Sequence, residues 1–139
     1  MTPEERSVLS LHFDKLTQVA TCGGCVPVAV QHADTGEFLL LAYTNEQAMR
    51  EAFRKRRLIL WNTSRNELWE KGATSGARFE LVEARVNCEQ NSLLYLVRPL
   101  ADSAEPGICH TRDADGHLRA SCYYRRIHLD SLALETLQP

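Results

Sequence analysis

The sequence lacks a long apolar run, since no stretch approaches the roughly 18 consecutive apolar residues that a membrane-spanning helix needs. It also lacks an excess of one charge, because 16 Lys and Arg stand against 18 Asp and Glu. This balance favours neither a nucleic-acid nor a membrane partner. Seven glycines without a period exclude a collagen-like chain. The acidic, polar start lacks the apolar segment of a secretory signal. We therefore expect one cytoplasmic domain spanning residues 1–139.

Cysteine, in contrast, is abundant for a chain of 139 residues. The number is odd, and the five positions are Cys22, Cys25, Cys88, Cys109 and Cys122. Thiols stay reduced in the cytosol, where clustered cysteines more often bind a metal or take part in catalysis than form disulfides. We therefore expect reduced thiols, some of them held for chemistry.

Hydrophobic periodicity predicts an α+β domain that is predominantly β, with two short helices. A capping box at Thr2 and Glu5 predicts the first helix over residues 2–16, and a cap at Thr44 predicts the start of the second. The expected strands cover residues 26–31, 38–43, 58–61, 79–87, 93–98 and 121–129. Residues 62–78 and 99–120 are expected to be long loops, and the tail 130–139 is expected to hold one helical turn. Long loops in a compact domain are usually functional or disordered.

Three cysteines and a histidine form the first candidate site. Cys88 follows a predicted strand, Cys109 and His110 lie in the second long loop, and Cys122 begins the last predicted strand. Three thiolates with an open fourth position would make a hydrolytic zinc site, in which the metal lowers the pKa of bound water to about 7. The wide spacing leaves a second interpretation open, namely three buried apolar cysteines.

The second candidate is the polar stretch from Trp61 to Gly76. Its hydroxyls and cations are suited to hold phosphate oxygens, and the residues concerned are Ser64, Arg65, Lys71, Thr74 and Ser75. The Walker A pattern is absent from this stretch. A polar turn between strands is an equally good interpretation of the same residues.

Several motifs resemble the phosphoribosyl-AMP cyclohydrolase family of histidine biosynthesis. They are Cys109-His110-Thr111, Ser121-Cys122-Tyr123-Tyr124-Arg125 and the stretch 68–76, and the hairpin sequence over 26–45 follows the family's order. The resemblance covers about residues 25–127. It implies the family's fold as an intertwined homodimer with shared active sites, in which water adds at C6 of the adenine ring and the N1–C6 bond breaks.

The resemblance also implies roles for individual residues. Zinc would be held by Cys88, Cys109 and Cys122, one of them contributed across the dimer, and His110 would act as an acid or base. The residues implied to line the substrate are Trp61, Ser64, Arg65, Lys71, Thr74 and Ser75.

The chain departs from the family where the family binds magnesium and substrate. The magnesium motif Asp-Cys-Asp-x-Asp reads Asn87-Cys88-Glu89-Gln90-Asn91 here, so one carboxylate, Glu89, remains. Magnesium depends on carboxylates and water, and we expect no stable pre-formed magnesium site. The motif Trp-Ser-Arg-Ser-Arg has lost one guanidinium at Thr63.

Three hypotheses about activity remain open at this stage. The chain is either the histidine-pathway cyclohydrolase, a divergent paralogue that opens another nitrogen heterocycle or amidine, or a non-catalytic zinc-stabilised ligand-binding protein. Cys22 and Cys25 form a separate Cys-x-x-Cys motif, which is half a metal site completed by His12, His32 or the partner subunit, a redox pair, or two thiols in a glycine-rich turn.

Overall fold

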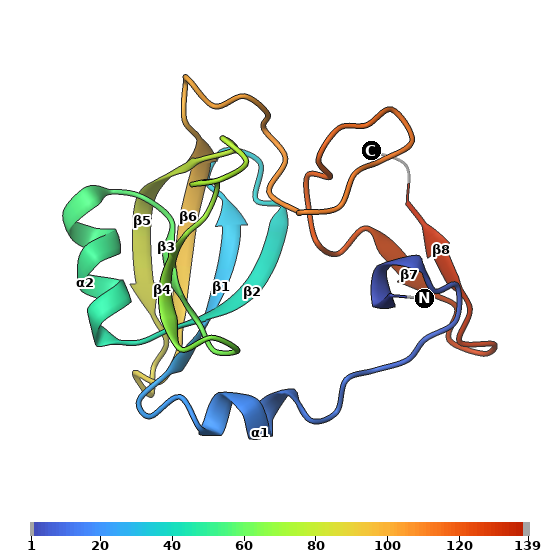
Figure 1. The fold of residues 1–139 in the computed structure, drawn as a ribbon, viewed down its shortest axis with the longest axis horizontal. Helices are drawn as coiled ribbons and strands as arrows, with labels where there is room; N and C mark the ends of the chain where they lie inside the picture. The colour runs from blue at the N-terminus through green and yellow to red at the C-terminus, as the bar shows by residue number, and fades with distance from the viewer. Residues whose placement is uncertain (1, 138–139) are drawn as a thin grey trace.

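The computed structural model of the chain describes residues 2–137 and is built around a four-stranded mixed sheet (Figure 1). The strand order is β2-β1-β6-β5, with an antiparallel pair at each side and a parallel pair in the centre. The bounds are β1 (Val26–His32), β2 (Phe38–Thr44), β5 (Phe79–Val86) and β6 (Leu93–Pro99). The predicted fold class, predominantly β with helices, is confirmed.

One face of the sheet is covered by helix α2 (Glu46–Lys55) and by the hairpin of β3 (Ile59–Asn62) and β4 (Glu67–Glu70). Alternation along β1 directs Val28 and Val30 to this face, where both are fully buried. The core also includes Ala48, Ala52, Leu58, Ile59, Leu60, Tyr95 and Val97. The N-cap of helix α2 is Asn45, whose side chain accepts a hydrogen bond from the Ala48 N–H. The predicted cap, Thr44, does not have this role.

The opposite face of the sheet is apolar and incompletely covered. Its residues alternate with the core residues, so Ala29 lies beside Leu41 on β2 and Leu94 on β6. The side chain of Leu41 is 50% exposed. The sheet therefore presents an apolar surface that residues 2–137 leave partly exposed.

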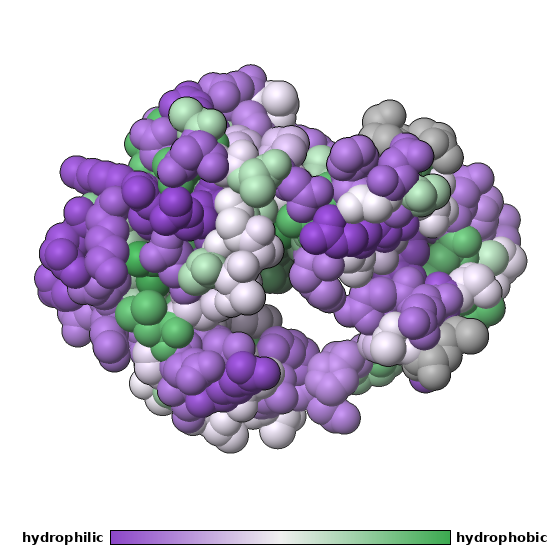
Figure 2. All heavy atoms as spheres, turned by 45° about the horizontal axis from the view of Figure 1, so that its top comes forward, coloured by the Kyte–Doolittle hydropathy of each residue, from purple (hydrophilic) through white to green (hydrophobic). Residues whose placement is uncertain are grey.

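The two ends of the chain pack together beside the sheet rather than on it. The 3₁₀ turn η1 (Pro3–Glu5) and the hairpin of β7 (Arg125–Ile127) and β8 (Leu134–Thr136) form this part. The Arg125 guanidinium donates hydrogen bonds to the carbonyls of Pro3 and Arg6. Figure 2 shows an open gap between the sheet and this terminal part.

Four predicted elements are wrong. Residues 2–16 do not form one helix: only η1 and α1 (Lys15–Ala20) are helical, and Phe13 remains 87% exposed because its apolar stripe has no surface to pack on. The polar stretch 62–78 contains β4, which pairs with β3. The last strand is only β7, so Cys122 lies in the preceding loop. The tail forms β8 in place of a helical turn, its final residues 138–139 lying outside the described range.

No helix in residues 2–137 is long and apolar enough to cross a membrane.

Candidate active site

Cys109 and Cys122 lie side by side at one end of the sheet. The Cys122 N–H donates to the Leu39 carbonyl at 2.8 Å, which attaches this cysteine to the start of β2. The Cys109 N–H donates to the Arg119 carbonyl, and the residue is buried. We call this end, where Gln31 pairs with Phe38, the thiol end.

The two thiols differ in acidity because they interact with each other. A hydrogen bond from Cys122 lowers the pKa of Cys109 to about 5, and contacts from the Thr111 hydroxyl (3.0 Å) and N–H (3.4 Å) add to this shift. The hydrogen bond to Cys109, followed by burial and the Cys109 charge, raises the pKa of Cys122. Because the thiolate is the form that binds metals, the pair provides one ready ligand and a second whose proton a metal ion would displace.

A buried cation accompanies the thiols. Lys71 is only 8% exposed, and burial lowers the pKa of its ammonium, while the negative charges of Cys122 and Cys109 act in the opposite direction. Its backbone N–H donates to Leu58, whose N–H in turn donates to Phe79 at the start of β5. These bonds hold Lys71 at the thiol end, where its charge stabilises thiolates.

Cys88 lies at the opposite end of the sheet. It belongs to the turn between β5 and β6, which follows the Val86–Leu93 pair, and it is exposed. We call this end, where Val26 pairs with Thr44, the turn end. Within residues 2–137 no three His, Cys, Asp or Glu side chains gather closely enough to hold a metal. One chain therefore brings together two of the three predicted zinc ligands, and the third is remote.

The turn that holds Cys88 is closed by amides. Asn87 donates to Asn91 at 2.7 Å, and its own Oδ1 accepts the N–H groups of Asn91 and Ser92. Asn91 Nδ2 in turn donates to Glu89 at 3.2 Å. The side chains of Asn87, Glu89 and Asn91, at the three positions where the family motif has aspartates, therefore form hydrogen bonds with one another inside the turn.

His110 contacts a carboxylate of the N-terminal turn. Its Nε2 lies 3.2 Å from Oε1 of Glu4, a residue of η1, and the imidazole is largely exposed. The Glu4 backbone N–H and then His110 lower the pKa of the Glu4 carboxyl. Sequence reasoning missed Glu4, because 106 positions separate it from His110 and no local spacing connects them.

The predicted substrate residues also divide between the two ends. Trp61, Ser64 and Arg65 lie at the tip of the β3–β4 hairpin, where Asn62 Oδ1 accepts the N–H groups of Ser64 and Arg65. Since β3 begins beside Lys71 at the thiol end, the hairpin tip lies toward the turn end (Figure 1). Thr74 and Ser75 lie at the thiol end with Lys71.

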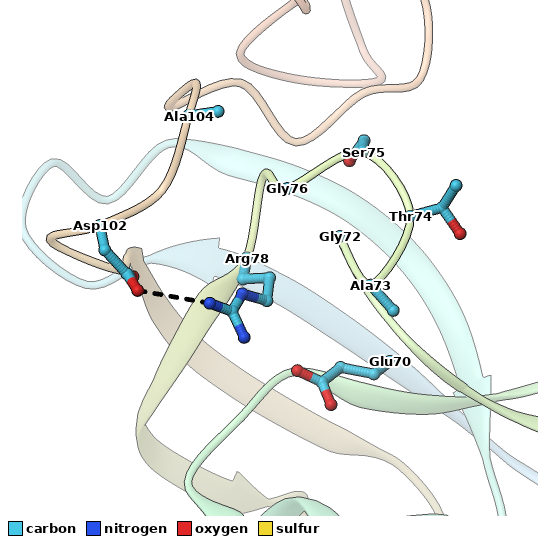
Figure 3. Close-up of a pocket in the computed structure, with 9 residues that line it drawn as sticks. All are labelled: Glu70, Gly72, Ala73, Thr74, Ser75, Gly76, Arg78, Asp102 and Ala104. Atoms are coloured by element: carbon cyan, nitrogen blue, oxygen red, sulfur yellow. Dashed lines mark hydrogen bonds and ion pairs between the residues drawn. The ribbon is translucent and has the colours of Figure 1, made fainter.

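Thr74 and Ser75 line a cavity of about 440 Å³. Figure 3 shows the loop from Gly72 to Gly76 curving over it, with Arg78 reaching across to Asp102 in an ion pair of 3.3 Å. Glu70 also lines the cavity and lies below the loop in this view. Sequence reasoning missed Glu70, Arg78 and Asp102. Glu70 lies within the motif over 68–76 and Arg78 lies two residues after it, whereas Asp102 comes from the loop after β6.

A Cβ at Gly72 would overlap the Ala77 carbonyl, and the φ of Gly72 is +86°. Glycine is the residue that adopts this conformation without strain. The close approach of the backbone at Gly72 to the backbone at Ala77 therefore shapes the loop that carries Thr74 and Ser75.

Cys22 and Cys25 are joined by a disulfide, so the expectation that all five thiols are reduced is wrong in this structure. Gly23 and Gly24 both have positive φ, 72° and 106°. They fold the turn so that the two cysteine Cα atoms lie 5.9 Å apart, within the range that a disulfide spans. Cys88, Cys109 and Cys122 remain free.

The mixed sheet, its covering hairpin and the paired thiols define a small α+β protein with a cysteine-based site. The phosphoribosyl-AMP cyclohydrolase family matches residues 40–124, which include all three free cysteines. The chain belongs to this family.

Individual relatives extend the match beyond that range. A phosphoribosyl-AMP cyclohydrolase from Caulobacter vibrioides is 42% identical over 102 residues, covering 73% of this chain and 67% of the relative. One from Hyphomonas neptunium is 40% identical over 104 residues, covering 75% and 71%. One from Archaeoglobus fulgidus is 38% identical over 109 residues, covering 78% and 91%. The resemblance inferred from the motifs is thereby confirmed.

Proposed function

We propose that this protein hydrolyses phosphoribosyl-AMP in histidine biosynthesis. Water adds its oxygen to C6 of the adenine ring, the N1–C6 bond breaks, and N1 takes a proton. The observation that carries the proposal is the pair Cys109 and Cys122 beside Lys71, in a chain of this family. We place the activity in the cytoplasm, because the free thiols serve as ligands only when reduced.

Zinc suits the donor set of the thiol end. Cys109 and Cys122 would hold it together with Cys88 of a partner subunit, and the charge of Lys71 would offset part of the thiolate charge. When bound, zinc activates water for attack at neutral pH. His110 would deliver the proton to N1, with Glu4 holding its ring.

A homodimer would complete the site. A monomer of 15.7 kDa typically exposes about 7,300 Å², whereas this chain exposes 9069 Å². The excess exceeds the roughly 800 Å² that each partner buries in a standard interface. The apolar sheet face around Leu41 and the gap beside the terminal part are the surfaces we assign to a second copy.

Growth of a histidine auxotroph that lacks phosphoribosyl-AMP cyclohydrolase tests the activity. We expect expression of this chain to restore growth without histidine, and the purified protein to consume phosphoribosyl-AMP in a spectrophotometric assay. Soluble, zinc-loaded protein that neither restores growth nor consumes this substrate would contradict the proposal.

Such a failure would favour the divergent paralogue, and one observation supports that second candidate. The amides of Asn87 and Asn91 replace family carboxylates and bond to each other. They thereby remove charge from a turn that a phosphorylated, metal-bound substrate would approach. A zinc site closed by four protein ligands would instead favour the non-catalytic binding protein.

Magnesium removal is expected to leave activity unchanged. With one carboxylate, Glu89, at the exposed turn, the chain offers little affinity for a hard cation. Turnover in magnesium-free buffer, with the zinc content verified by metal analysis, should stay within about twofold of its original value. A larger loss that added magnesium reverses would show that the site persists.

A further inference from the structure

Helix α1 brings a lysine to the tip of the β3–β4 hairpin. The Lys15 ammonium donates to the Thr63 hydroxyl at 3.1 Å and to Gln18 Oε1 at 3.1 Å, and it lies 5.6 Å from the centre of the Tyr43 ring. Thr63 is buried, whereas Lys15 is partly exposed. Three neutral groups thus hold this cation in one place, which reduces the entropy lost when it binds a ligand.

In the described part of the chain, the charge of Lys15 has no carboxylate partner. Among residues 2–137 no carboxylate lies within 4.0 Å of its ammonium. Arg65, on the same hairpin tip, has one long contact of 3.9 Å to Glu67, and both side chains are well exposed. The hairpin tip therefore carries two cations, Arg65 of the turn itself and Lys15 bonded to Thr63, together with the Ser64 hydroxyl. Such a cluster attracts an anion with several acceptor oxygens.

The attachment of α1 supports a defined position for Lys15. The helix ends at Ala20, and the Thr21 hydroxyl and N–H both bond to Gln18. The Cys22–Cys25 disulfide then closes the turn into β1. The segment that delivers Lys15 precedes residue 40, so the lysine lies outside the region that the family model matches.

We propose that Lys15 is a substrate-binding residue that, with Arg65, holds a phosphate monoester of the substrate at the hairpin tip. The proposal rests on the proposed function, whose substrate carries phosphate groups. It adds to the cyclohydrolase site a cation delivered by the N-terminal segment.

Binding of inorganic phosphate to the full-length protein tests this role independently of turnover. A ³¹P NMR titration should show weaker phosphate binding by Lys15→Gln, by about fivefold or more, and near wild-type binding by Lys15→Arg. Lys55→Gln is the matched control: it removes an exposed lysine on α2 that pairs with Glu51, and its phosphate affinity should not change. Equal affinity in Lys15→Gln and the wild type, or no phosphate binding by the wild type, would overturn the proposal.

Steady-state kinetics then distinguish a role of Lys15 in substrate binding from a role in supporting the hairpin turn at Thr63. A contact that binds the substrate and the transition state equally lowers KM without changing kcat. Loss of such a contact in Lys15→Gln should therefore raise the KM for phosphoribosyl-AMP about tenfold at constant kcat. Thr63→Val removes the hydroxyl but keeps the cation, and its KM should change by less than threefold. Equal effects of the two substitutions would mean that Lys15 only supports Thr63. A wild type without turnover refutes the proposed function, while the phosphate titration still decides the role of Lys15.

Discussion

Cys109→Ser is expected to abolish both zinc binding and cyclohydrolase activity. Cys109 is the buried member of the thiol pair, and its lowered pKa makes it the thiolate that is present at neutral pH. A serine hydroxyl does not ionise in this range and is a poor zinc ligand. We expect zinc to fall from about one ion per chain to a trace, and kcat/KM to fall by at least about 1,000-fold.

Metal analysis and a steady-state assay on the same preparation check this result. Circular dichroism should show a folded variant, because serine is close to cysteine in size. The double variant Cys22→Ser/Cys25→Ser is the control, since these residues form the separate disulfide, and it should retain zinc and activity. A zinc-free Cys109→Ser variant with full activity would refute the site.

Mixing two inactive variants is expected to restore about one quarter of the wild-type activity. The thiol end holds Cys109 and Cys122, and Cys88 lies at the turn end. If each site combines the thiol end of one subunit with the turn end of the other, a heterodimer of Cys88→Ser and Cys109→Ser contains one intact site and one doubly defective site. Random exchange makes half of the dimers mixed, and half of their sites are intact.

The experiment needs proof that subunits exchange. The variants can be co-expressed with two different tags and purified by both, which isolates the heterodimer and raises the expected activity to about half of the wild type. Cys109→Ser mixed with Cys122→Ser is the matched control, because both defects lie at the thiol end and no combination is intact. Purified Cys88/Cys109 heterodimers without activity would exclude the shared site.

Most of the sheet could be predicted from the sequence because local patterns determine it. Alternating apolar residues mark β1 and β2, and the turn between them has Gly36 at a φ of 77°. The predicted helix over 2–16 failed: in its apolar stripe Leu9 is only partly buried, and Phe13 and Leu16 remain exposed. Isolated short helices are only marginally stable without tertiary packing. Periodicity alone therefore overestimated the helical content of this segment.

Polar strands were harder to predict. β4 reads Glu67-Leu68-Trp69-Glu70 and lay within a stretch expected to be a loop, but its backbone pairs with β3. β8 likewise forms because its neighbour β7 and the N-terminal segment supply backbone partners. Short strands take their stability from cross-strand partners, which local composition does not show.

The sequence by itself determined the chemistry of this protein: its cysteines, the polar loop that carries Thr74 and Ser75, and the family to which it belongs. The tertiary structure decided the placement of these groups. It paired Cys109 with Cys122, set Cys88 at the far end of the sheet, and brought Glu4 to His110 and Lys15 to Thr63. The physical reason is that reactivity follows from residue type and short motifs. Proximity follows from strand pairing and packing between residues far apart in the chain.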